Sequence, residues 1–148
     1  MESRVLIKFR SRQLQRGAAA VEFALVVPVL ILLVFGITDF GLMFNNQSVF
    51  ANASRDAARA GSFLATAQEI RDVVKAEVDY LPSIASWTTD VACKKPGGAL
   101  CSSAYDTDKE SGGTVTVTIT YSHKWLTPSI LGLPNTSTIT KISQMRIE

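Results

Sequence analysis

The chain has 148 residues, enough for one small domain, and carries 15 Lys and Arg against 13 Asp and Glu. Residues 18–37 read AAAVEFALVVPVLILLVFGI and contain a single charged residue, Glu22. Twenty helical residues rise about 30 Å, which is the thickness of the hydrocarbon core of a bilayer. The sequence therefore excludes an ordinary cytosolic protein and predicts a transmembrane helix over residues 18–38.

The net charge of +2 is unevenly distributed. The first 17 residues carry a local charge of +4, from Arg4, Lys8, Arg10, Arg12 and Arg16 against Glu2. Basic residues directly before an apolar span hold that end in the cytoplasm and send the following part across the membrane. The remainder is slightly acidic and has no basic patch, so we expect no nucleic-acid partner.

The helix is expected to continue beyond the membrane as an amphipathic segment with one narrow stripe of apolar and small side chains. Met43, Phe50, Ala57 and Leu64 recur every seven residues, and Asn46, Ala53 and Ala60 follow at a fixed offset. The stripe predicts a packing surface, either for a sheet of the same chain or for another helix.

A second, short helix is predicted after Gly61 and Ser62. Thr66 and Glu69 have the spacing of a capping box, and Pro82 is expected to end the helix. Its apolar positions are Ile70, Val73, Val74, Val78 and Leu81.

Residues 82–148 predict strands and turns. Residues 114–121 alternate threonine with Val115, Val117, Ile119 and Tyr121, as in a half-buried strand. Residues 136–147 predict a second strand in which Ile142 is out of phase, so we expect either a bulge near Lys141 or partial cover on both faces. A third strand is expected around 87–93. The fold class predicted is α+β: a long N-terminal transmembrane and amphipathic helix, a short second helix and a small antiparallel sheet.

Cys93 and Cys101 are the only cysteines, and Pro96, Gly97 and Gly98 between them favour a turn. In an oxidising compartment we expect a disulfide. The alternative, a two-cysteine metal site, lacks ligands because His123 is the only histidine.

We find no catalytic constellation in the sequence. His123 has no serine or cysteine partner in a nucleophile motif. Asp106, Asp108 and Glu110 lie in a loop-like segment without the glycine and distal glutamate of an EF-hand calcium loop. We therefore expect no enzyme activity, no cofactor and no metal.

Glu22 is unusual because a carboxylate in an apolar helix is normally retained only where it has a partner. The surrounding stretch reads RGAAAVEF and resembles a class III prepilin signal of the type IV filament superfamily. That resemblance implies cleavage between Gly17 and Ala18, so that Glu22 becomes the fifth residue of the mature chain. A secretory signal is cut after its apolar run, whereas here the anchor is retained. In an assembly of parallel helices, the new ammonium of Ala18 and the Glu22 carboxylate of a neighbouring subunit can then pair.

The resemblance extends further. Ala18 at the first mature position, Glu22 followed by Phe23, and the segments ALVVPVLILLVFGITDFG and FNNQSVFANASRDAARAG are similar to the TadE family of Tad (Flp) tight-adherence pilus systems. VTVTITYSHKWLTP suits the β region of that family. The family signature often has Glu-Tyr where this chain has Glu-Phe, which leaves a sister TadF- or TadG-like assignment open.

The resemblance implies three regions: a cleaved leader (1–17), a transmembrane helix (18–38) and a periplasmic or extracellular α+β domain (39–148). It implies a minor pilin, or pseudopilin, of the inner membrane that acts in pilus assembly for adhesion and biofilm formation. The implied partners are prepilin peptidase, other Tad pilins and pseudopilins, the inner-membrane assembly platform and membrane lipid. The alternatives are an uncleaved single-pass protein whose outer domain binds a ligand or partner, and a membrane-tethered enzyme.

Overall fold

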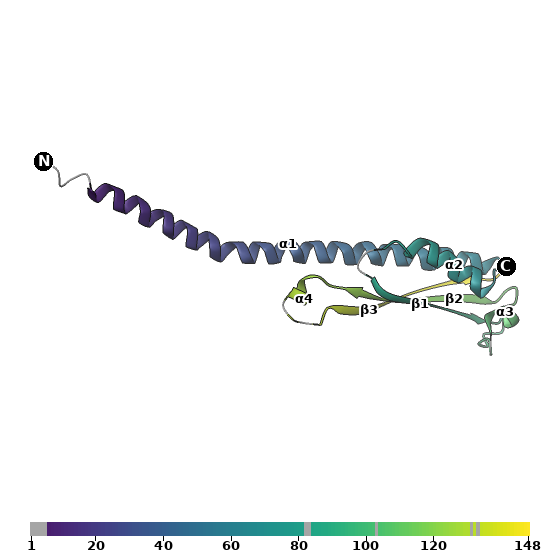
Figure 1. The fold of residues 1–148 in the computed structure, drawn as a ribbon. Coiled ribbons are helices and arrows are strands. Elements are labelled where there is room, and N and C mark those ends of the chain that lie inside the picture. The colour runs from purple at the N-terminus through teal and green to yellow at the C-terminus, as the bar shows by residue number, and fades with distance from the viewer. Residues whose placement is uncertain (1–5, 82–83, 103, 131, 133) are drawn as a thin grey trace. The chain divides into compact units, whose positions relative to one another are not determined.

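A computed structural model of the chain describes residues 6–81, 84–102, 104–130, 132 and 134–148. The chain divides into two units, residues up to Thr38 and residues Asp39–Glu148, and the helix α1 (Leu6–Ser62) contributes to both (Figure 1). The second unit adds a short helix and a three-stranded antiparallel sheet. The predicted α+β class is therefore confirmed.

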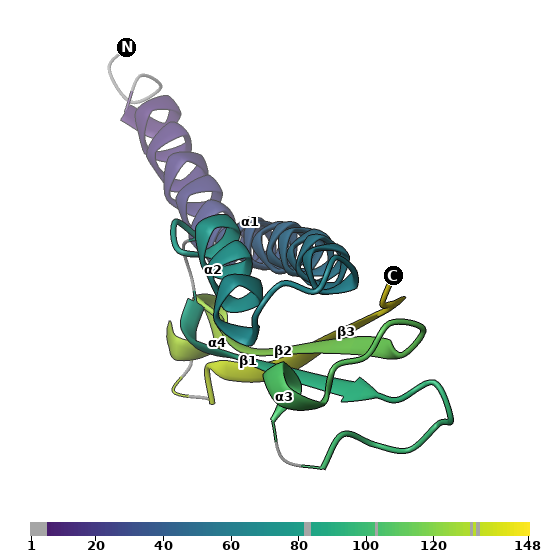
Figure 2. The same cartoon turned by 90° about the vertical axis from the view of Figure 1, so that its right-hand side faces the viewer.

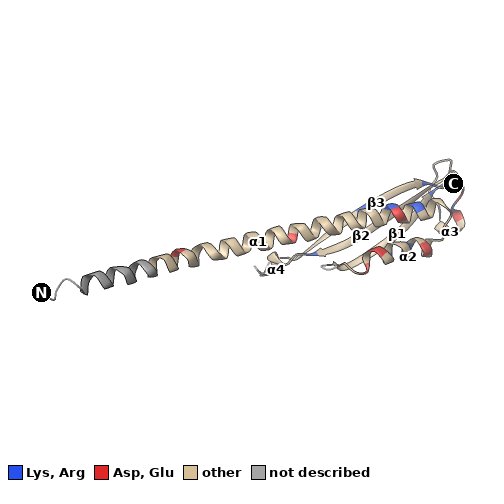
Figure 3. Cartoon of the chain, turned by 90° about the horizontal axis from the view of Figure 1, so that it is seen from above, with Lys and Arg blue, Asp and Glu red and all other residues tan. Residues whose placement is uncertain are grey.

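From Gly17 to Thr38, α1 is apolar and its side chains are mostly exposed. Its best 18-residue window has a mean hydropathy of 2.7 and none of it is buried, so α1 is long and apolar enough to serve as a membrane anchor. Between Gly17 and Thr38 the only charged residue is Glu22, and the helix is almost free of charge colours in this stretch (Figure 3).

The sheet has the strand order β1 (Ile84–Lys94), β2 (Thr114–Lys124), β3 (Thr136–Arg146). All three predicted strands are present: β1 and β2 extend beyond their expected ranges, and β3 ends one residue before the end of its expected range. β2 and β3 pair from Thr114 opposite Arg146 to Lys124 opposite Thr136 without a register shift. The expected bulge near Lys141 was therefore wrong. Partial cover of both faces was wrong as well, because Ile142 points away from the core and is 61% exposed.

The core lies between one face of the sheet and the two helices that cover it (Figure 2). The alternation of β2 places its apolar side chains on this face, and the part of α1 beyond Asp39 contributes Phe50 and small alanines. The ring of Phe50 stacks on that of Tyr121 with centroids 3.9 Å apart. Fully buried side chains include Phe50, Ile70, Val74, Val115, Val117 and Ile119.

The second helix, α2 (Ala67–Val78), begins with the predicted capping box. The Thr66 hydroxyl accepts the backbone N–H of Glu69, and the Glu69 carboxylate accepts the backbone N–H of Thr66. Ile70, Val74 and Val78 form its buried side, as predicted. Pro82, which was expected to end the helix, lies outside the described residues.

Candidate functional site

The residues of the prepilin-like motif follow one another on α1. Gly17, Ala18, Glu22 and Phe23 are all exposed, Phe23 by 70% of its surface. Among the side chains that the structure describes, none forms a hydrogen bond or ion pair with Glu22. A β-carbon at Gly17 would have no atom within 4 Å. This segment of a single chain is therefore accessible, and its one carboxylate is not compensated by those side chains.

The seven-residue stripe on α1 faces the sheet of the same chain. Phe50 and Ala57 are completely buried, as are Asn46 and Ala53 at the offset positions, and Met43 is half-buried. Leu64 is different: it follows the end of α1, has a positive φ of 61° and is 45% exposed. The stripe was expected to pack either on a sheet of the same chain or on another helix. In the structure, the chain's own sheet covers the central part of the stripe.

Polar bonds on either side of the stripe align α1 with β3. The hydroxyls of Ser54 and Ser143 lie 2.8 Å apart, and Lys141 Nζ donates to Gln47 Oε1 at 3.1 Å. Because hydroxyl and amide groups need defined partners, these bonds fix the position of the helix along the strand.

A polar cluster that sequence reasoning missed lies where the second unit begins. Asp39 is only 2% exposed and accepts the backbone N–H of Leu126 at 3.1 Å and that of Thr127 at 2.8 Å. These N–H groups open the short helix α4 (Thr127–Ile130) in the connection between β2 and β3. Burial opposes the charge of Asp39, but the hydrogen bonds from Thr127 and Leu126 outweigh it, and the pKa of Asp39 is lowered from its ordinary value.

His123 is completely buried beside this cluster. Its Nδ1 lies 3.3 Å from Nδ2 of Asn46, and its ring meets Trp125 edge to face with centroids 4.9 Å apart. Burial lowers the pKa of His123, and the Asp39 carboxylate offsets only part of this effect. The imidazole thus acts as a polar link between α1 and β2 and is shielded from solvent.

The base of the same connection is closed by further bonds. The Trp125 indole donates to Ser137 Oγ at 2.8 Å, and the backbone N–H of Trp125 donates to the Asn135 carbonyl at 2.7 Å. The Trp125 ring also meets Phe40 of α1, with centroids 5.6 Å apart. The sequence contains one signal for this cluster: Asp39 is a lone acid at the end of an apolar helix, and such a carboxylate needs hydrogen-bond donors.

The loop between β1 and β2 is bonded across its base and along its length. Cys93 and Cys101 form a disulfide with Cα atoms 5.4 Å apart. Asp106 accepts the backbone N–H of Ala67 at 2.8 Å, and Asp108 accepts that of Ser102 at 2.7 Å. Both carboxylates lie on the short helix α3 (Tyr105–Asp108) and hold loop segments in place. In the described part of the chain, no group of three or more His, Cys, Asp or Glu is placed to hold a metal ion.

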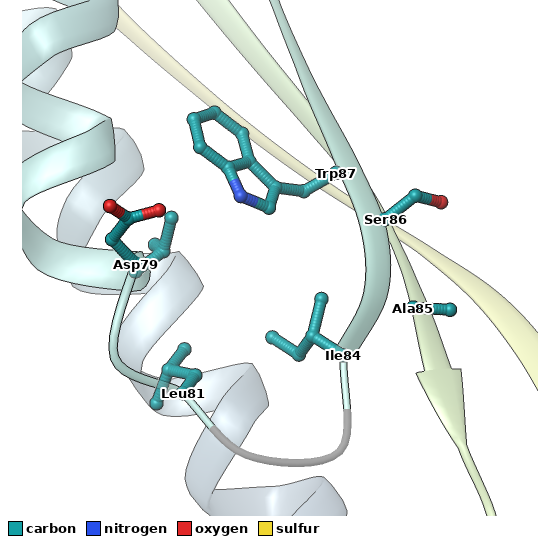
Figure 4. A pocket seen from close by; sticks show the side chains of 7 residues that line it. Asp79, Leu81, Ile84, Ala85, Ser86 and Trp87 are labelled. Atoms are coloured by element: carbon teal, nitrogen blue, oxygen red, sulfur yellow. The ribbon is translucent and has the colours of Figure 1, made fainter.

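A shallow pocket of about 310 Å³ lies between the end of α2 and the start of β1. Figure 4 shows Leu81, Ile84 and Trp87 around it, with the Asp79 carboxylate at one side. Its polar side-chain groups are the Asp79 carboxylate, the Ser86 hydroxyl and the Trp87 indole N–H.

The chain matches a known protein family over part of its length. The family described as TadE-like protein matches residues 17–59, which run from the glycine of the motif through the apolar part of α1 into the stripe. No curated protein and no solved structure matches the chain. This segment is therefore similar to the TadE-like family, in agreement with the resemblance seen in the sequence.

Proposed function

We propose that this chain, TadE-like over residues 17–59, is a minor pilin or pseudopilin that acts in the assembly of a Tad pilus. The observation that carries the proposal is the position of the family match, which begins at Gly17 and includes Glu22. The leader that ends at Gly17 is basic, and the helix that begins at Ala18 is apolar.

In this proposal, prepilin peptidase cuts between Gly17 and Ala18 at the cytoplasmic face of the inner membrane. The cut removes the local +4 charge and leaves a new ammonium at Ala18. Glu22 is exposed in the single chain and lies within an apolar helix. Pairing with the ammonium of a neighbouring subunit offsets the cost of keeping both charges in a poorly solvated setting. Assembly in the correct axial position is then favoured over the separate subunits.

The outer domain has a mechanical role in this proposal. Its core, its polar links and its loop bonds support a rigid body on α1, and in this proposal that body has no catalytic role. Such a body serves as a tip or base element that joins other pilins and the assembly platform. Adhesion and biofilm formation follow from the assembled pilus.

Processing tests the proposal directly. In cells that contain prepilin peptidase, N-terminal sequencing of the membrane-extracted protein should start at Ala18. Gly17→Arg should accumulate the precursor, which is longer by 17 residues. Gly41→Arg is the matched control, because β-carbons at both glycines have open space and Gly41 lies outside the motif. An intact leader in the wild-type protein would refute the proposal.

The charge pairing needs a separate test. Glu22→Gln keeps the size of the side chain and removes its charge, so we expect normal cleavage and a loss of surface pili. Wild-type numbers of pili with Glu22→Gln would show that the charge has no part in assembly.

A further inference from the structure

Three large apolar side chains are exposed at the end of the outer domain that carries α4. At the end that carries α4, Phe40 is 55% exposed, Phe44 is 62% exposed and Leu126 is 51% exposed. Phe40 and Phe44 lie one turn apart on α1, and Leu126 follows Trp125, whose ring contacts Phe40. We call Phe40, Phe44 and Leu126 the proximal patch.

The proximal patch is fixed next to the end of the predicted transmembrane segment. Asp39 follows Thr38 directly in the chain, and its carboxylate holds the N–H groups of Leu126 and Thr127. Along a helix, Phe40 and Phe44 lie about 3 Å and about 9 Å beyond residue 38. The headgroup region on each side of the hydrocarbon core is about 5–8 Å thick. The patch therefore falls at the depth of the lipid headgroups.

The charges around the patch fit such a position. No charged residue occurs between Phe40 and Ser54, and Lys124 is the only charged residue between Glu110 and Lys141. Asp39, the one acid nearby in the sequence, is buried and hydrogen-bonded. Aromatic side chains and lysine at the end of a span are the residues that membrane interfaces favour. The patch thus presents apolar groups and one cation to the lipid and no exposed carboxylate of its own.

We infer that the proximal patch is a second membrane contact, in which Leu126 and the aromatic pair on α1 insert into the interfacial region of the outer leaflet. This inference rests on the proposed membrane anchoring of α1 and goes beyond it, because it places part of the outer domain against the bilayer. The domain then stands on the membrane at two points, α1 and the β2–β3 connection, and its orientation relative to the surface is restricted.

Depth-dependent fluorescence quenching tests the inference on the full chain reconstituted into vesicles of phosphatidylethanolamine and phosphatidylglycerol. Trp87→Phe and Trp125→Phe remove both native tryptophans, and Leu126→Trp or Leu100→Trp then adds one reporter. Leu100 is the matched control, because it is a leucine of 70% exposure in the loop at the opposite end of the sheet. Lipids brominated near the top of the acyl chain serve as quenchers.

We expect the fluorescence of the tryptophan at position 126 to be quenched and its emission to shift to shorter wavelength. The tryptophan at position 100 should be unquenched and should emit at the wavelength of a tryptophan exposed to water. Equal quenching at the two positions would overturn the inference. A blue shift at 126 that disappears when the protein is diluted in lipid would also overturn it, because a second copy would then cover the patch. Flotation of the vesicles separates the proposals: protein that does not float with the lipid contradicts the anchor itself, whereas floating protein without quenching at 126 contradicts only the inference.

Discussion

Substitution of Asp39 gives the sharpest test of how the outer domain is joined to the helix. Asp39 is almost fully buried and accepts two backbone N–H groups from the β2–β3 connection, at 2.8 and 3.1 Å. A hydrogen bond to a charged group contributes about 1.5–3 kcal/mol. Asp39→Ala removes both bonds. We use the lower end of this range because Leu126 is exposed and lets water reach part of the site, so the two bonds together give a loss of about 3 kcal/mol in stability. Asp39→Asn keeps one oxygen acceptor and should cost about half as much.

The assay is hydrogen exchange of the Leu126 and Thr127 amides in the micelle-bound full chain. A loss of about 3 kcal/mol in local opening speeds their exchange by about 100-fold, since about 1.4 kcal/mol corresponds to a factor of ten. Asp106→Ala is the matched control, because Asp106 accepts a backbone N–H at 2.8 Å from Ala67 and should leave both amides unchanged. If the two amides exchange at the wild-type rate in Asp39→Ala, the carboxylate does not hold the connection and the reasoning is refuted.

Three further changes test the core and its titration. A β-carbon at Gly61 would lie 2.9 Å from the nearest side-chain carbon, so Gly61→Ala should lower the free energy of unfolding by about 1–3 kcal/mol, whereas Gly41→Ala, which has open space, should not. Because Phe50 is fully buried and stacks on Tyr121, Phe50→Ala should lower the free energy of unfolding by about 3–5 kcal/mol. Phe50→Leu loses mainly the stacking and should cost much less. Denaturant unfolding measures all four glycine and phenylalanine variants. Burial lowers the pKa of His123 below its ordinary 6.5, so the folded state binds this proton less readily than the unfolded state does. Stability should be complete above about pH 6.5 and decrease as the pH falls toward the folded-state pKa; thermal unfolding of His123→Gln should lack this component, and an unchanged pH profile in that variant would exclude His123 as its source.

The elements that could be predicted from the sequence depend on local patterns. The capping box of α2 uses residues three apart, and the alternation of β2 shows its buried face directly. The buried part of the stripe follows from helical periodicity, but Leu64 does not, because the chain leaves the helix at Ser62 and takes a positive φ at Leu64. A period of seven residues does not reveal where a helix stops.

The contacts that could not be predicted join distant parts of the chain. Asp39 and Thr127 are separated by 88 positions, and no spacing rule connects an acid at the end of a helix with N–H groups in a later loop. The strand was predicted over residues 114–121, but β2 continues to Lys124, and His123 on this extension lies in the interior. Because Ile142 is out of phase with the other apolar residues of its strand, we expected a bulge or partial cover of both sheet faces. An exposed isoleucine on a regular strand explains the same pattern.

The continuity of α1 has a consequence for tension on a fibre. The helix that is apolar enough to anchor the chain also supplies Phe50 and Ala57 to the core, with no linker between these two stretches. In the proposed pilus, a pull on the anchor is therefore transmitted to the outer domain through the backbone of α1. Because α1 lies along the strands that it covers (Figure 1), the load slides the helix over the sheet and strains the Phe50 stack and the Ser54 and Lys141 bonds together, instead of peeling them apart one by one.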